Sequence, residues 1–127
     1  MAIEYRDSAL SSGVAGKLAA GDRLPWIAPE RGGDDNYAPL RALDWQVHVY
    51  GSASAPITAA CASAGLPVHA FDWRPAIAAA GLARDAAYLV RPDGYIGWAA
   101  AGAEADADAL RRYVHAWGIS ARASGHA

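Results

Sequence analysis

The hydrophobic pattern is clearest where two short apolar runs flank a polar turn. The runs Ala87–Val90 and Tyr95–Trp98 are rich in the aromatic and β-branched residues that strands favour. Between them, Pro92 suits the first corner of a type I turn, Asp93 can bond nearby backbone, and Gly94 accepts the positive φ of a bulged hairpin. The pattern therefore predicts two antiparallel strands joined by a tight turn.

Upstream of the hairpin, the pattern predicts a strand, a helix and a second strand. The strand Trp45–Gly51 alternates, with its valines on one face. Ser54 caps the helix that follows, Gly65 ends it, and Val68–Trp73 is the second strand. The apolar residues of the helix have the spacing of one buried face: Ile57, Ala60, Cys61 and Ala64. Because a helix joins the two strands, we expect them to be parallel.

Two further helices complete the pattern. A short one over Pro75–Ala80 is stopped by Gly81, and a longer one runs from about Ala103 to Trp117. The longer helix carries acidic residues near its start and basic residues near its end, which complements the helix dipole. Its predicted buried stripe consists of Ala107, Leu110, Val114 and Trp117.

The order strand–helix–strand–helix–strand–strand–helix predicts an α/β fold of the thioredoxin-like type. Its central mixed sheet joins a parallel βαβ unit to an antiparallel hairpin, with helices on both faces. We expect this domain to cover residues 19–119, after an extended lead-in over 1–18 and before a flexible tail over 120–127. The Gly- and Asp-rich segment Pro29–Pro39 is predicted to be an exposed turn.

Composition narrows the classes of function. With 127 residues, the chain is long enough for one domain with a real core. A formal net charge of −2 argues against nucleic acid or an anionic membrane as a partner. No apolar run has the roughly 18–20 residues of a membrane-spanning helix. The single cysteine, Cys61, excludes an internal disulfide and fits a reducing, cytoplasmic location.

Three segments together resemble the C-terminal thioredoxin-like domain of FAD-dependent aromatic-ring hydroxylases, the class A flavin monooxygenases of phenol and polyketide hydroxylation. They are Ala-Gly-Asp-Arg-Leu-Pro at 20–25, His-Val-Tyr-Gly at 48–51 and Tyr-Leu-Val-Arg-Pro-Asp-Gly-Tyr-Ile at 88–96. Residues 3–6 resemble the linker that leaves the flavin domain of these enzymes, so the likeness runs from residue 3 to about residue 117.

The resemblance implies that FAD-binding and substrate domains precede this one in the full enzymes. No Gly-x-Gly-x-x-Gly follows a predicted strand here, so we expect no cofactor in this chain. A thioredoxin would also carry a reactive cysteine after its first strand, at a helix N-terminus. Ser52–Ala55 occupies that place, and Cys61 lies on the apolar stripe, where it is predicted to be structural. Arg84–Ala86 lacks the proline that thioredoxins carry before the next strand. The redox site is therefore predicted to be lost.

Other polar residues give no catalytic or metal site. His48 and His69 lie on strands expected to be neighbours, but neither has a further ligand at helical spacing, and both are interpreted as strand positions. Asp72, Asp85 and Asp93 are interpreted as residues of strand ends and turns. Three tryptophans, Trp45, Trp73 and Trp98, are expected in or beside the core, whereas Trp26 and Trp117 lie near the ends of elements.

Two functions remain open. The first is a non-catalytic module with a structural or protein-interaction role, which is not by itself an enzyme. Its expected partner is a second copy or a flavoprotein, and its candidate interface residues are Tyr5 and Trp26. The alternative is a small enzyme or ligand-binding protein that uses the thioredoxin-type groove. Its candidate residues are Ser52, Ser54, Arg84 and Asp85.

Overall fold

The computed structural model describes residues 14–29, 35–101 and 104–119, and one four-stranded sheet organises them. The sheet has the order β4-β3-β5-β6. Its strands are β3 (Gln46–Tyr50), β4 (Val68–Phe71), β5 (Ala87–Val90) and β6 (Ile96–Ala100). β4 runs parallel to β3, and β5 runs antiparallel to both β3 and β6. The predicted parallel unit and antiparallel hairpin are confirmed.

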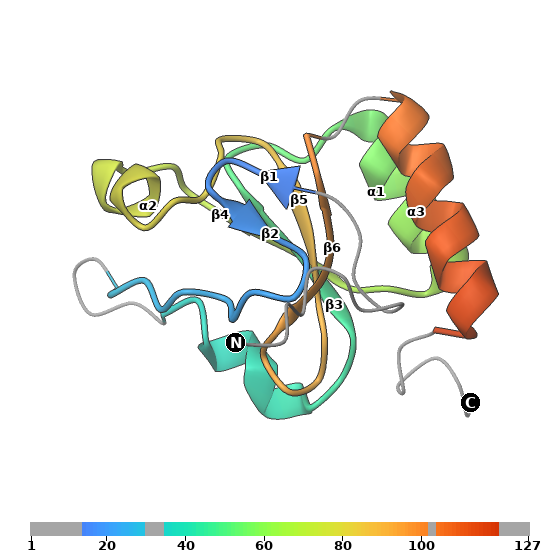
Figure 1. Cartoon of the computed structure of the whole chain (residues 1–127), viewed down its shortest axis with the longest axis horizontal. Coiled ribbons are helices and arrows are strands. Elements are labelled where there is room, and N and C mark those ends of the chain that lie inside the picture. Colours follow the sequence, from blue (N-terminus) through green and yellow to red (C-terminus); the bar gives the residue numbers. More distant parts are fainter. Residues whose placement is uncertain (1–13, 30–34, 102–103, 120–127) are drawn as a thin grey trace, which may run out of the picture.

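Helices lie on both sides of this sheet, as predicted for a thioredoxin-like fold. Figure 1 shows α1 (Ala55–Ala64) and α3 (Glu104–Trp117) side by side on one face, with α2 (Pro75–Ala79) on the other side. Ser54 caps α1 by accepting a hydrogen bond from the Ile57 N–H, and Gly65 ends α1 in the left-handed conformation.

The end of the predicted lead-in over residues 1–18 contributes to two short strands. β1 (Val14–Ala15) and β2 (Leu18–Ala19) pair as a small antiparallel sheet. The Ala15 side chain is buried, and Leu18 is half-buried against the same cluster. The end of the lead-in therefore belongs to the folded core, because small and apolar side chains there find partners near β6.

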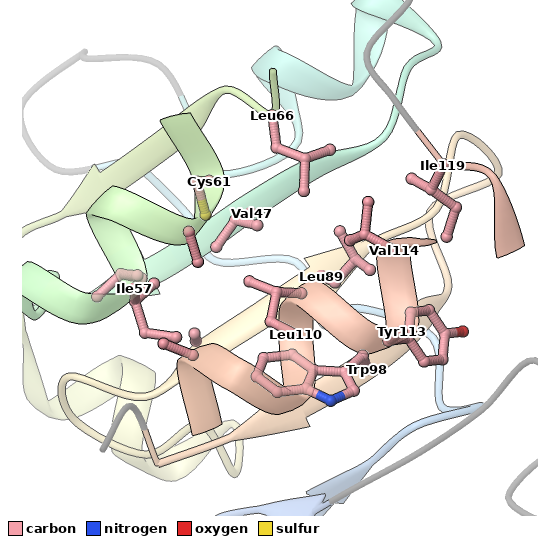
Figure 2. Close-up of a cluster of buried hydrophobic side chains, with 14 residues drawn as sticks. Val47, Ile57, Cys61, Leu66, Leu89, Trp98, Leu110, Tyr113, Val114 and Ile119 are labelled. Carbon is pink, nitrogen blue, oxygen red and sulfur yellow. The ribbon is translucent and has the colours of Figure 1, made fainter. Parts of the chain in front are cut away.

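Two hydrophobic clusters fill the two faces of the sheet. The first packs β3 and β5 against α1 and α3, and Figure 2 shows Val47, Cys61, Leu89 and Leu110 pointing into it. The second lies on the opposite face, where Tyr50, Tyr88 and their neighbours meet the segment that holds Leu24 and Ile27. The helical stripes of α1 and α3 are confirmed, except that Trp117 is 45% exposed.

The segment before β3 is more ordered than an exposed turn. The 3₁₀ helix η2 (Ala38–Ala42) follows Asn36, and the side chain of Asn36 is only 2% exposed. The prediction of an exposed turn over Pro29–Pro39 is therefore wrong at its C-terminal end, and the reason is a hydrogen-bond network described below. Within the part of the chain that the structure describes, no helix is long and apolar enough to cross a membrane.

Candidate functional site

The loop after β3 and the loop before β5 meet at the position of a thioredoxin groove. Asp85 Oδ1 accepts a hydrogen bond from the Ser52 N–H at 2.7 Å, and the Asp85 N–H donates to the Tyr50 carbonyl at 2.9 Å. Gly51 allows this approach, since a Cβ there would collide with the Asp85 carboxylate. The structure thus brings Ser52 and Asp85 together, and the Asp85 carboxylate serves to hold backbone in place.

The other two candidate groove residues are placed differently. The Ser54 hydroxyl accepts from the Ile57 N–H at 3.3 Å as the cap of α1. Arg84 is exposed on the surface. The Ser54 hydroxyl and the Asp85 carboxylate use part of their hydrogen-bonding capacity on backbone N–H groups. The groove therefore presents few polar groups that converge on a ligand.

The only cysteine of the chain has the properties of a core side chain. Cys61 is fully buried between α1 and the sheet, and burial raises the pKa of its thiol to about 11. At neutral pH the thiol is therefore protonated and inaccessible, whereas thiol–disulfide exchange needs an accessible thiolate. Among the described residues, no group of three or more His, Cys, Asp or Glu side chains is placed to hold a metal ion.

A buried hydrogen-bond network occupies the opposite face of β3. We call its members, Asn36, Gln46, His48 and Tyr50, the polar network; each is at most 2% exposed. Asn36 Nδ2 lies 3.0 Å from the Tyr50 hydroxyl, and His48 Nδ1 lies 3.1 Å from the same hydroxyl. His48 Nε2 lies 2.6 Å from Gln46 Oε1. The network therefore joins the segment before η2 to three residues of one strand.

The ends of the network fix the direction of every bond in it. Gln46 Nε2 donates to the Pro39 carbonyl at 3.0 Å, so Gln46 Oε1 accepts from His48 Nε2–H. A neutral imidazole then has Nδ1 as its acceptor, and the Tyr50 hydroxyl donates to it. The Tyr50 oxygen in turn accepts from Asn36. All the hydrogen bonds therefore run in one direction: Asn36 donates to Tyr50, Tyr50 to His48, His48 to Gln46, and Gln46 to the Pro39 carbonyl.

Asn36 also fastens the preceding loop. Its Nδ2 donates to the Pro25 carbonyl at 2.8 Å, and its Oδ1 accepts from the Ile27 N–H at 2.7 Å. These backbone groups lie beside buried Leu24 and Ile27, and the Asn36 amide satisfies both of them. The polar network is consequently closed, and its chemistry is that of a structural clamp.

His48 stays neutral within this clamp. Burial, with a smaller contribution from the nearby His69, lowers its pKa to about 3. The two imidazole centroids are 5.7 Å apart, so the predicted proximity of His48 and His69 is confirmed. His69 is half-buried, and burial lowers its pKa as well. Neutral imidazoles at neutral pH fit the interpretation of both residues as strand positions.

A cavity of about 310 Å³ opens beside the polar network at β4. Its inner wall contains Tyr50 and Phe71, whose rings stack with centroids 5.0 Å apart. Asp72 and Arg74 line its mouth, and Arg74 Nη2 donates to the Ala28 carbonyl at 2.6 Å. A second cavity of about 480 Å³ shares Phe71 and continues along β4 towards η2. Together they form a groove along this edge of the sheet.

The two candidate interface residues have different outcomes. Tyr5 lies outside the described residues. Trp26 is 54% exposed, and its indole Nε1 donates to Asp35 Oδ2 at 2.7 Å. This bond, ahead of contributions from backbone amides and Arg41, lowers the pKa of Asp35. The apolar side chains that anchor this segment in the core are Leu24 and Ile27, which are buried.

The turn between β5 and β6 has the geometry that its sequence requires. Gly94 has φ +87°, and its N–H donates to the Arg91 carbonyl at 2.9 Å. Asp93 Oδ1 accepts from the Tyr95 N–H at 3.1 Å, next to Pro92 at the first corner. The register shifts between Leu89 and Val90, as in a bulged hairpin.

Sequence reasoning did not find the polar network. The signal was present in the alternation of β3: if the two valines face one side, then Gln46, His48 and Tyr50 face the other. Three polar side chains in a row on one strand face indicate either solvent or a closed network. Asn36 is the fourth member, and its role depends on tertiary contact that no local pattern contains.

Fold and site together define a thioredoxin-like domain in which capping and buried groups replace the redox cysteines. Residues 18–119 match the family model described as the C-terminal domain of aromatic-ring hydroxylases. The chain belongs to that family. No curated protein is detectably similar to it.

Two solved structures share the fold. The flavin-dependent monooxygenase PieE, solved with FAD and substrate, aligns over 79% of this chain at 22% identity, with a TM-score of 0.52. BexE, studied for oxidation during BE-7585A biosynthesis, aligns over 84% at 27% identity, with a TM-score of 0.55. The alignments cover 20% and 22% of those proteins, so this chain spans about a fifth of their length.

Proposed function

We propose that this chain is a non-catalytic, thioredoxin-like C-terminal module of, or associated with, a FAD-dependent aromatic-ring hydroxylase. Its role is structural and protein-interacting, in the cytoplasm. The observation that carries the proposal is the occupation of the thioredoxin site: Ser54 caps α1 where a reactive cysteine would lie, and Cys61 is buried. The family match and the two shared folds support the link to hydroxylases.

The groove counts against the alternative of a ligand-binding protein. Ser54 and Asp85 direct oxygens to backbone N–H groups, and the half-buried Ser54 side chain is part of a helix cap. Specific small-molecule sites need several polar groups that converge on the ligand. A ligand would have to replace these hydrogen bonds to the backbone.

Trp26 supports the interaction role. It is a large apolar side chain at the surface, beside a loop held rigid by Asn36. Tryptophan is enriched among the interface residues that contribute most to binding. We propose that Trp26 contacts the flavoprotein part of a hydroxylase, and that this chain itself binds no FAD.

Two assays test the non-catalytic part of the proposal. In insulin-disulfide reduction with dithiothreitol, we expect the rate of a no-protein control, with a true thioredoxin as the positive control. In a flavin-fluorescence titration, we expect no saturable binding of FAD. Turnover that disappears in Cys61→Ala, or stoichiometric FAD binding, would contradict the proposal.

The interaction part has a matched pair of variants. Trp26→Ala is expected to weaken binding to the separately expressed flavin portion of an aromatic-ring hydroxylase by at least about tenfold. Trp117→Ala removes the other exposed tryptophan, on α3, and is expected to leave binding unchanged. Equal affinities for both variants and the parent would show that Trp26 lies outside the interface.

A further inference from the structure

The two edge strands of the four-stranded sheet, β4 and β6, differ in whether other parts of the described chain bond their outer side. At β6, the Gly21 N–H donates to the Ile96 carbonyl at 2.7 Å, and the Ile96 N–H donates to Asp22 at 2.8 Å. Nearby, the Leu24 N–H donates to Gly94 at 3.0 Å, so the segment before η2 covers this edge. Among residues 14–29, 35–101 and 104–119, no strand pairs with the outer side of β4.

The hydrogen bonds between β3 and β4 show which groups of β4 point outward. The Val47 N–H donates to Pro67 at 2.9 Å, and the Gly51 N–H donates to Phe71 at 2.7 Å. In a parallel ladder, alternate residues of a strand bond the same neighbour, so His69 also faces β3. The N–H and C=O groups of Val68 and Ala70 consequently point away from the sheet. Ala70 is exposed and Val68 half-buried, so these groups are accessible.

β4 is a short edge strand of four residues flanked by Pro67 and Asp72, but no charged residue, proline or bulge lies within it. Natural sheets carry charged residues, prolines or bulges there, because an open edge pairs readily with another strand. The strand Val68–Phe71 contains no charged residue and no proline, and its parallel register with β3 is continuous. The groove described above follows this same edge.

We propose that a second copy of this chain pairs through β4, antiparallel and about a two-fold axis, to give one continuous sheet. The proposal deepens the interaction role inferred above and rests on it. Antiparallel pairing brings the outward groups of Val68 and Ala70 opposite outward groups of the same strand in the other copy. A two-fold axis closes the contact, so it produces a dimer and no fibre.

The charges along the groove fit this antiparallel arrangement. Gln46 bonds the Pro39 carbonyl and the adjacent Val47 pairs with Val68, so η2 with Arg41 lies at the Val68 end of β4. Asp72 directly follows β4 and lines the cavity at the opposite end. Antiparallel pairing places the Arg41 end of each copy beside the Asp72 end of the other. Among the other charges, Arg74 bonds Ala28 and Asp35 bonds Trp26, and Arg41 gives only the smallest of the contributions that lower the pKa of Asp35. The two ends are therefore complementary in sign.

Amide hydrogen exchange of the unmodified chain tests the proposal directly. We expect the Val68 and Ala70 amides to be protected at high protein concentration and to exchange rapidly on dilution. The His69 and Phe71 amides, which bond β3, are expected to stay protected throughout. Sedimentation over the same range should show a dimer that dissociates. A monomer at all concentrations, or fast exchange at Val68 and Ala70 in a dimer, would overturn the proposal.

A proline at the outward position separates edge pairing from other contacts. Ala70→Pro removes an N–H that points away from β3, so the ladder to β3 is retained. We expect the dissociation constant of the dimer to rise at least about tenfold. Ala70→Val keeps the N–H and is expected to dimerise like the parent. A dimer that survives Ala70→Pro in a folded protein would reject β4 while leaving the interaction role through Trp26 open to its own test.

Discussion

Both faces of the sheet bury a hydrophobic cluster, but one face also buries the polar network. On the face of α1 and α3, Val47, Val49 and Leu89 meet apolar helix residues without hydrogen bonds between side chains. On the other face, His48 and Tyr50 join the polar network and reach Asn36 in the preceding loop. Apolar contacts are nondirectional, whereas each buried hydrogen bond needs one particular partner.

The two faces of the sheet should therefore respond differently to substitution. A dry cluster tolerates side chains of similar volume, because packing depends mainly on shape and total volume. A closed network fixes one arrangement, because a buried donor without its acceptor loses about 1–3 kcal/mol. We infer that the helical face tolerates repacking, and that the other face, where a hydrophobic cluster surrounds the polar network, also fixes the position of the loop that carries Trp26.

The largest expected effect comes from a cavity on the helical face. Leu110 is fully buried between α3 and the sheet. Leu110→Ala should lower the free energy of unfolding by about 2–5 kcal/mol, measured by urea denaturation. Leu110→Met keeps most of the volume and should cost less than about 1.5 kcal/mol. Equal losses for both variants would show that volume is not what this face requires.

Acid should act on the polar face through His48. Its pKa is about 3 when folded, against 6.5 for the free side chain, because burial penalises the charged form. The unfolded chain therefore binds more protons below pH 6.5. Stability should be highest above that pH and fall as the pH is lowered towards 3, by on the order of 1.4 kcal/mol per pH unit.

The matched variants for this titration are His48→Gln and His69→Gln. Removing His48 should flatten the dependence of unfolding free energy on pH, whatever its effect at neutral pH. His69 is less buried, and its pKa is lowered by burial alone, so His69→Gln should remove a smaller part of the slope. An unchanged slope in His48→Gln would show that the histidine is not buried as a neutral group.

Removal of a single oxygen should reveal how closed the network is. Tyr50→Phe leaves His48 Nδ1 without a donor and one Asn36 N–H without an acceptor. The expected loss is about 2–4 kcal/mol by chemical denaturation. On the helical face, Ile57→Val removes one methylene and should cost about 0.5–1.5 kcal/mol. A smaller loss for Tyr50→Phe than for Ile57→Val would contradict the contrast between the faces.

The hairpin turn gives the smallest effect and lies outside both clusters. A Cβ at Gly94 would touch only a Leu40 methyl group, at 3.7 Å, so the loss in Gly94→Val measures backbone strain at φ +87°. We expect about 1–3 kcal/mol in the free energy of unfolding. Asp93→Asn keeps the oxygen that accepts from the Tyr95 N–H and should cost little. Equal melting temperatures of Gly94→Val and the parent would show that the turn does not need Gly94.

The fold could be predicted because its signals are local. The Pro-Asp-Gly turn, the Ser54 cap and the Ile57–Ala64 stripe each lie within a few residues and agree with one another. What could not be predicted depends on distant contacts. Asn36 pairs with Tyr50 across the fold, and Ala15 meets Tyr88, whose hydroxyl donates to its carbonyl at 3.0 Å.

Trp117 shows the same limit on a helix. Its spacing places it on the apolar stripe of α3, yet its side chain is 45% exposed and its ring lies tilted against that of Tyr113, with centroids 6.5 Å apart. Periodicity gives the face of a helix, and the length of the neighbouring elements decides how far that face is buried.

The one-way order of donors in the polar network has a consequence for how this family can vary. Replacing any one of Asn36, Gln46, His48 or Tyr50 leaves its neighbours without a hydrogen-bond partner. Reversing the direction of one bond forces all the others to reverse. Homologous chains should therefore change these positions together, either keeping all four polar residues or replacing them jointly by apolar ones. Correlated substitution at 36, 46, 48 and 50, with the loop before β3 altered in length or course, is the expected evolutionary signature of this clamp.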